Sequence, residues 1–209
     1  VIGWRILKEF GLDGITVNVN SLGCAECRPK HRTALLAYLR VREADLTEES
    51  RRRMDKNPLR VLDSKVDGPK LTDAPAMKDF LCDACCSHHA AFLKMIAAAG
   101  VTFVENDRLV RGLDYYSRTV FEFVSPDLGA QSAVAAGGRY DDLVKTLGGP
   151  VTPAVGFALG MDRAVSIKLK KGAAKAAGRG PRAHVLALDA ASADLAFAVA
   201  HQLRSNGFA

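Results

Sequence analysis

The chain has 209 residues, of which 48% are hydrophobic and 25% are charged, and its formal net charge is +6. Such proportions are typical of a globular protein with room for one good core and a smaller satellite unit. No apolar run approaches the roughly 20 residues that a membrane-spanning helix needs, and no signal-peptide pattern opens the chain, so we expect no membrane association. The excess positive charge suits a polyanionic partner, although it is spread along the chain.

The hydrophobic pattern predicts a helix at residues 1–10, closed by Gly11, and then a strand at residues 15–19. From residue 21 the chain consists of short, charged helical segments punctuated by proline and glycine, which is typical of a helical insertion within a sheet domain. Helices are expected there at residues 30–40, 48–56 and 76–99.

Strand patterns return at residues 102–105, 118–124 and 132–136, and a helix is predicted at residues 139–147. Residues 155–170 are interpreted as a strand that runs into a helix. Residues 168–182 are rich in Lys, Gly and Ala, which indicates a helix end followed by a linker. A strand at residues 183–188 and a helix at residues 193–203 would form one repeat of an α/β domain.

The most informative stretch runs from Leu109 to Glu122 and has the sequence LVRGLDYYSRTVFE. It places a cation, a carboxylate and two phenols close together, immediately before an alternating apolar run. A strand would hold these groups rigidly enough to bind a small polar ligand together with an anion. An ordinary strand with an incidental arginine and two half-buried tyrosines would leave the same local pattern.

This stretch resembles the histidine-binding motif of histidyl-tRNA synthetase, a class II aminoacyl-tRNA ligase. Residues 136–141, AGGRYD, resemble the second histidine-specific motif of the family, and residues 156–163, GFALGMDR, resemble class II motif 3. Residues 57–65, NPLRVLDSK, resemble the bacterial type of the family's insertion. The resemblance runs, with gaps, across essentially the whole chain.

The resemblance implies ligation of L-histidine to tRNA(His) through a histidyl-adenylate, driven by ATP with Mg²⁺. Arg111 would be catalytic, because the arginine at this position of the motif contacts the α-phosphate and the histidine carboxylate. A guanidinium suits that role since it stays charged and can bind two oxygens in a planar fork. Arg163 and Gly160 would join Arg111 at ATP. The residues implied at histidine are Arg111, Tyr115, Tyr116, Gly137, Gly138 and Tyr140.

The fold class implied is α+β, with part of the antiparallel-sheet catalytic domain of a class II synthetase. Residues 1–20 and 105–170 would belong to this core, and residues 21–104 to its helical insertion. A linker at 171–182 would lead to a truncated α/β anticodon-binding domain at 183–209. Class II motifs 1 and 2 are not found and the chain begins without a methionine, so we expect a fragment that is inactive alone and a homodimer when full-length.

Two Cys-x-x-Cys pairs, Cys24 with Cys27 and Cys82 with Cys85, have the ligand spacing of a structural zinc site. The fold would have to bring the pairs together, and Cys86, His88 and His89 offer alternative ligands. Reduced, partly buried thiols are the other interpretation. An odd total of five cysteines without a secretion signal indicates a reducing compartment, and we expect the cytoplasm.

Two other hypotheses remain open at this point. The regulatory subunit of ATP phosphoribosyltransferase shares the synthetase core but does not charge tRNA. A free-standing zinc module that binds RNA would explain only the cysteine pairs. The arginine of the first motif, the block at residues 57–65 and the strand–helix pattern after the linker favour the synthetase.

Overall fold

In the computed structural model the described residues are 1–110, 115–172 and 183–208. They belong to two units, Val1–Ile167 and Lys168–Ala209, and each unit is described by itself. Among these residues, no helix combines the length and the hydropathy needed to cross a membrane.

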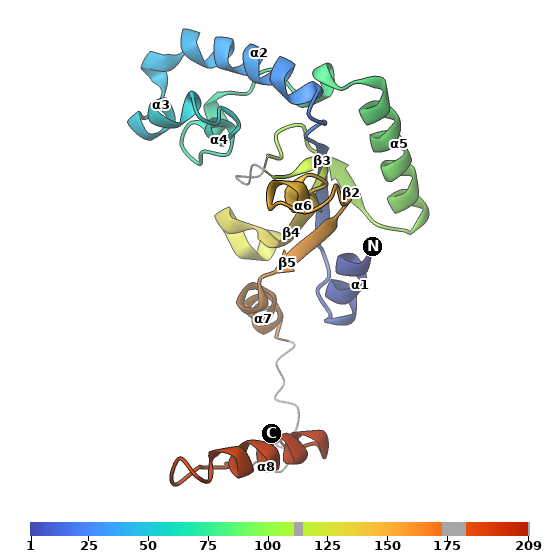
Figure 1. The fold of residues 1–209 in the computed structure, drawn as a ribbon, viewed down its shortest axis with the longest axis vertical. Helices are drawn as coiled ribbons and strands as arrows, with labels where there is room; N and C mark the ends of the chain where they lie inside the picture. Colours follow the sequence, from blue (N-terminus) through green and yellow to red (C-terminus); the bar gives the residue numbers. More distant parts are fainter. Residues whose placement is uncertain (111–114, 173–182, 209) are drawn as a thin grey trace. The chain divides into compact units, whose positions relative to one another are not determined.

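A five-stranded sheet is the central element of the first unit, with the strand order β2-β1-β3-β4-β5 (Figure 1). Strands β3, β4 and β5 have only antiparallel neighbours, while β1 and β2 pair in parallel. A parallel pair needs a long crossover connection, and the inserted helices between β1 and β2 supply it. The strands are β1 (Thr16–Ser21), β2 (Phe103–Glu105), β3 (Ser117–Val124), β4 (Ala133–Arg139) and β5 (Val155–Leu159).

The helices are α1 (Ile2–Glu9), α2 (Cys27–Val41), α3 (Glu48–Met54), α4 (Leu59–Leu62), α5 (Asp83–Ala98), α6 (Leu143–Thr146), α7 (Met161–Lys170) and α8 (Ala193–Ser205). Short 3₁₀ turns separate several of them, including one at Met77–Phe80 that precedes α5. Between β1 and β2, the chain therefore forms four α-helices in the region where an insertion was predicted.

The main core lies between the sheet and helices α1, α5 and α7. Val19 and Ile167 are completely buried in it, and Ile96 brings α5 onto the same cluster. Alternate residues of a strand face the same side, so Phe121 and Phe123 of β3 both pack towards this core. The opposite face of β3 is left for the residues of the candidate site.

Helices α2, α3 and α4 have a small core of their own, centred on Leu35, Leu39 and Met54. A buried carboxylate reinforces it. Asp67 accepts hydrogen bonds from the Thr47 hydroxyl at 2.6 Å and the Ser50 hydroxyl at 2.5 Å. These bonds hold the pKa of Asp67 below its usual value although burial opposes them, so the carboxylate stays charged and joins the start of α3 to the turn after α4.

Several predicted elements are confirmed, among them the first helix, the strand at 15–19, the strand at 118–124 and the strand-to-helix segment at 155–170. Gly11, at the end of α1, adopts a φ of 81°, as a helix-terminating glycine should. The fold class is also confirmed, since the unit is α+β with a mainly antiparallel sheet.

Three predictions are wrong. The helix expected at 76–99 begins at Asp83, because a separate 3₁₀ turn and an extended residue, Leu81, come first. The helix expected at 139–147 is only Leu143–Thr146, since β4 continues through Arg139. Residues 183–187 form no strand. A strand needs a partner for its backbone groups, and no strand lies among the described residues of the second unit.

Candidate functional site

Three tyrosine side chains from two sequence motifs meet beside the sheet. The ring centroid of Tyr115 lies 5.0 Å from that of Tyr116 and 6.0 Å from that of Tyr140, and the remaining pair is 6.4 Å apart. Tyr116 is 6% exposed and Tyr115 is 38% exposed, so the cluster has a buried base and an open side. Three phenols around one opening can offer both donors and acceptors to a small polar ligand.

Two glycines of β4 make this arrangement possible, because they leave room for neighbouring atoms of the protein itself. A Cβ on Gly138 would lie 2.7 Å from Cδ1 of Tyr116, and a Cβ on Gly137 would meet the backbone of β5 at Phe157. Both were expected among the residues at histidine. In the structure Gly138 lets the Tyr116 ring lie on the sheet, and Gly137 lets β5 approach β4.

Asp141 connects the ends of three strands around the tyrosines. Its carboxylate accepts from Nε of Arg139 at 2.6 Å and from the amide of Ala154 at 3.2 Å. Its own amide donates to the hydroxyl of Ser117 at 3.1 Å. Because Ser117 follows Tyr116 and Asp141 follows Tyr140, this network fixes the backbone on which both rings stand. Sequence reasoning assigned Asp141 no role, although its place directly after Tyr140 was the available signal.

The catalytic arginine of the sequence interpretation, Arg111, lies outside the described residues, as does Asp114. The segment that leads towards them is anchored from β1. Asn20, which is buried, donates from Nδ2 to the carbonyls of Leu109 at 3.0 Å and Asp107 at 3.3 Å. This anchor was not predicted, because an asparagine within a strand has no distinctive sequence pattern.

The two residues expected at ATP outside the first motif lie together where β5 meets α7. Nη1 of Arg163 donates to the carbonyl of Ala133 at 2.6 Å, at the start of β4. A Cβ on Gly160 would lie 3.3 Å from Cδ of Arg163, so the glycine leaves room for the arginine to cross the turn. The guanidinium is therefore held against the same sheet as the tyrosines, at the opposite end of β4.

The fold brings the two cysteine pairs together. Sγ of Cys24 lies 3.6 Å from Sγ of Cys27 and 3.9 Å from Sγ of Cys82, and the four Sγ atoms, including that of Cys85, all lie within 4.8 Å of one another. Tetrahedral zinc with Zn–S bonds of about 2.3 Å requires S···S distances of about 3.8 Å. The donor set and its spacing therefore fit a zinc ion.

The alternative ligands do not join this cluster. Cys86 is exposed and directs its thiol to the carbonyl of Leu81, while Nε2 of His89 contacts Glu105 at 3.2 Å. His88 instead lines a cavity together with Arg139, and burial, followed by the nearby arginines, lowers its pKa. Of the seven candidate metal ligands, the fold therefore brings together the four cysteines of the two Cys-x-x-Cys pairs.

The thiols of the cluster differ in acidity. Burial raises the pKa of Cys85 to about 12, and burial also raises the pKa of Cys27. For Cys24, burial acts in the same direction, but hydrogen bonds from the backbone of Cys27 and Glu26 outweigh it and lower the pKa to about 7. Cys24 is therefore the thiol that most readily forms the thiolate a metal ion binds.

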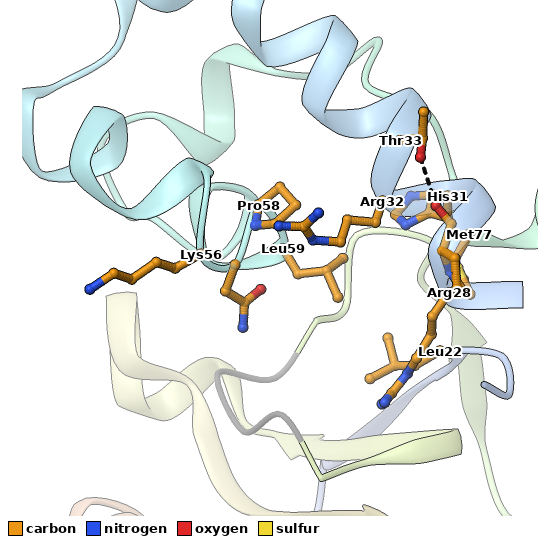
Figure 2. A pocket seen from close by; sticks show the side chains of 11 residues that line it. Leu22, Arg28, His31, Arg32, Thr33, Lys56, Pro58, Leu59 and Met77 are labelled. Atoms are coloured by element: carbon orange, nitrogen blue, oxygen red, sulfur yellow. Dashed lines mark hydrogen bonds between the residues drawn. The ribbon is translucent and has the colours of Figure 1, made fainter. Parts of the chain in front are cut away.

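A basic pocket of about 370 Å³ is lined in part by Met77, which also packs against Cys27 and Cys85 (Figure 2). Arg28 and Arg32 extend from α2, and Lys56 extends from the segment between α3 and α4. Leu22 and Leu59 line the pocket and also pack in the cluster of buried residues that contains Tyr116. No carboxylate lines it among the described residues, so the pocket favours an anionic ligand.

The comparisons with known proteins agree on one family. The family model for histidyl-tRNA synthetase matches residues 25–164, which include all three tyrosines of the cluster and three of the four cysteines. The chain belongs to the histidyl-tRNA synthetase family. A histidine–tRNA ligase of Nitratidesulfovibrio vulgaris is 48% identical over 98% of this chain and 49% of its own length, and that of Oleidesulfovibrio alaskensis is 56% identical over 75% and 38%.

Solved structures of the histidyl-tRNA synthetase family support the fold. The apo enzyme of S. aureus superposes with a TM-score of 0.68 at 24% identity, covering 99% of this chain and 51% of that one. A Bacillus halodurans structure described as an ATP phosphoribosyltransferase regulatory subunit/histidyl-tRNA synthetase gives a TM-score of 0.52 at 19% identity, over 100% of this chain and 56% of that one. The chain spans about half the length, or less, of the curated relatives cited above.

We predict that Asp141→Asn lowers the free energy of unfolding by roughly 1–2 kcal/mol, because the amide cannot serve Arg139 as a charged acceptor. Urea unfolding followed by circular dichroism measures this. Asp142→Asn is the matched control, since the side chain of Asp142 is exposed and contributes no cap to α6, and its effect should stay within about 0.5 kcal/mol. Equal losses in the two variants would contradict the role given to Asp141.

Proposed function

We propose that this chain supplies the histidine pocket and part of the ATP site of an enzyme that ligates L-histidine to tRNA(His). The observation that carries the proposal is the meeting of Tyr115, Tyr116 and Tyr140, which come from two separate motifs, in a fold of this family. The names of the curated relatives, all histidine–tRNA ligases, support the same reaction.

The proposed roles follow from the chemistry of adenylate formation. The histidine carboxylate attacks the α-phosphate of ATP, pyrophosphate leaves, and negative charge increases at the α-phosphate in the transition state. Arg111 is proposed as the catalytic cation there, because a preorganised guanidinium stabilises such charge. Arg163, with Gly160 beside it, is proposed at the outer phosphates, which Mg²⁺ accompanies.

At the amino acid, the tyrosines are proposed to recognise the imidazole. A phenol can donate to one ring nitrogen or accept from the other, and its ring can pack against the edge of the ligand. Gly137 and Gly138 contribute by allowing the tight packing of β4, β5 and Tyr116 described above. We propose the homodimer as the state of the full-length protein and the cytoplasm as its location, in keeping with its free thiols.

The tRNA partner is supported by the basic pocket of Figure 2. Arg28, Arg32 and Lys56 place positive charge beside the hydrophobic cluster that holds Tyr116. Phosphates of an RNA strand are the ligands that such a surface attracts most strongly at long range. The regulatory-subunit alternative has less support, since the structure that names it is only 19% identical to this chain.

We predict that the 209 residues alone catalyse no histidine-dependent ATP–pyrophosphate exchange, since class II motifs 1 and 2 are not in the sequence. A chimera can be made by joining this chain to the part of the N. vulgaris ligase that it does not match. This chimera should restore exchange and charging of tRNA(His). Exchange by the chain alone would contradict the need for the other part. A folded chimera that binds histidine but charges no tRNA would favour the regulatory subunit.

In the same chimera, Arg111→Ala should slow adenylate formation by roughly 100-fold or more, the effect expected when one preorganised donor to a developing charge is lost. Single-turnover adenylation at saturating histidine and ATP measures it. Arg51→Ala, on the exposed face of α3, is the control and should leave the rate unchanged. A near-normal rate for Arg111→Ala would remove this residue from the catalytic role.

We further propose that Cys24, Cys27, Cys82 and Cys85 bind one structural zinc ion. The proposal is supported by the close approach of the four Sγ atoms to tetrahedral spacing. The ion would join the segment after β1, which holds Cys24 and Cys27, to the start of α5, where Cys82 and Cys85 lie. It would thereby link two parts of the insertion that are far apart in sequence. Its role would be structural, because four protein ligands leave no open position for a substrate.

Protein purified with zinc present and without chelator should contain about one zinc ion per chain. Cys82→Ser should lose the metal, whereas Cys86→Ser should keep it, because Cys86 lies outside the cluster. Elemental analysis of the three proteins gives the answer. Less than about a tenth of an equivalent in the unchanged protein would show that these residues are ordinary thiols.

A further inference from the structure

Leu22 and Gly23, where the insertion begins, are hydrogen-bonded to Arg118, which lies two residues after Tyr116. The amide of Arg118 donates to the carbonyl of Gly23 at 2.8 Å, and the amide of Leu22 donates to the carbonyl of Arg118 at 2.6 Å. These two bonds extend the pairing of β1 and β3 by one step beyond Ser21. The backbone on either side of Arg118 is therefore fixed by the residues directly before Cys24.

Those residues are themselves held against the cysteine cluster. Gly23 has a φ of 65°, and a Cβ placed on it would lie 2.6 Å from Cβ of Cys27 and would also meet Met77. From the start of α5, the amide of Cys82 donates to Sγ of Cys27 at 3.1 Å. The position of Gly23 consequently depends on how the four cysteines are arranged.

Arg118 is a position that needs such support. Its φ of 53° lies in the left-handed region, and among the described residues it is the one non-glycine residue there. It also lies in a bulge, because the register between β3 and β4 shifts between Ser117 and Val120. A strained residue of this kind persists only where its surroundings determine its conformation.

The conformation at Arg118 decides where Tyr116 points. Tyr116 lies two residues earlier, is 6% exposed, and has its ring fitted over Gly138. If the bulge relaxed by one residue, the side chains of Ser117 and Tyr116 would turn towards the other face of the sheet. The ring could then no longer lie against both Gly138 and Tyr140.

We infer that a metal ion bound by Cys24, Cys27, Cys82 and Cys85 fixes the bulge at Arg118 and thereby positions Tyr116 in the proposed histidine site. The inference rests on the proposed function and on the proposed zinc site. Four metal–thiolate bonds would hold Gly23 far more firmly than the packing of the metal-free cysteines does. The metal site is thus a positioning element for histidine binding as well as a closure of the insertion.

Amide hydrogen exchange tests directly whether the metal is coupled to the bulge at Arg118. The two bonds that carry this coupling involve the amides of Leu22 and Arg118. In the chimera, removal of zinc by a chelator should speed exchange at these two amides by at least about tenfold, and adding zinc back should restore protection. Exchange of Phe121 and Phe123, in the middle of β3, should not change. Because the same molecules are measured with and without metal, the result does not depend on whether a cysteine variant folds.

Three variants separate the coupling from a general loosening of the insertion. Cys82→Ser should reproduce the zinc-free exchange pattern, and Cys86→Ser, the neighbouring exposed thiol, should behave as the unchanged protein. Asp67→Asn weakens the core of α2–α4 without touching the cysteines. It should increase exchange around Thr47 and Ser50 while leaving Arg118 protected.

The functional readout is the histidine KM in ATP–pyrophosphate exchange. Zinc removal and Cys82→Ser should each raise it on the order of tenfold, with a smaller change in the ATP KM, since Tyr116 is proposed to touch histidine. Asp67→Asn and Cys86→Ser should leave both constants near those of the unchanged chimera.

The possible failures are distinguishable. If the metal is lost while Arg118 stays protected and the histidine KM is unchanged, the coupling is overturned, and the zinc site and the synthetase function both stand. If Cys82→Ser keeps a full equivalent of zinc, the ligand assignment is overturned and the coupling with it. If the unchanged chimera shows no histidine-dependent exchange, the proposed function fails, and amide exchange alone then decides whether the metal holds the bulge.

Discussion

The antiparallel pairing of β3 with both β1 and β4 is the constraint on which the rest of the molecule depends. One face of β3 packs into the main core through Phe123, and the other supports Tyr116 through Val120. A change of one residue in this register would exchange the two faces. The bulge between Ser117 and Val120, the Asp141 network and the bonds to Leu22 and Gly23 all fix this register at the end of β3 where the tyrosines stand.

The candidate site and the insertion are consequently joined by packing and by backbone hydrogen bonds. Leu59 of α4 packs in the cluster with Tyr116, and Leu22 of the insertion's base belongs to the same cluster. The basic pocket shares both leucines. The insertion thus contacts the proposed histidine site at Leu22, close to the proposed metal ligands, and at Leu59.

Much of the fold could be predicted because hydrophobic periodicity is local. The strand around Phe121 and Phe123 and the helix closed by Gly11 follow from residues within a few positions of each other. The extension of β4 through Gly137, Gly138 and Arg139 could not be predicted in this way. Two glycines are poor strand formers by themselves, and here pairing with β3 and β5 on both sides overrides that preference.

The three tyrosines of the candidate site could be singled out from the sequence, but their arrangement could not. The motifs singled out Tyr115, Tyr116 and Tyr140, and the structure brings these together. The Cys-x-x-Cys spacing indicated metal ligands, but nothing local could show that pairs separated by 82 − 27 = 55 positions converge. Asn20 and Ser117 were missed because their roles are hydrogen bonds to backbone groups that are distant in sequence or specific to one turn.

The chain leaves the sheet after β1 and returns through α5 at one place, where Cys82 contacts Cys27. Loops of the insertion that lie away from this point and from Leu59 can change in length with little thermodynamic consequence, since doubling a flexible loop adds only about 0.6 kcal/mol to its closure. Helices α2–α4 can therefore diverge or acquire new binding surfaces, provided that the residues at the attachment point and the packing of Leu59 in the cluster with Tyr116 are kept. The surfaces of these helices that face away from Leu59 can change without altering the tyrosine cluster.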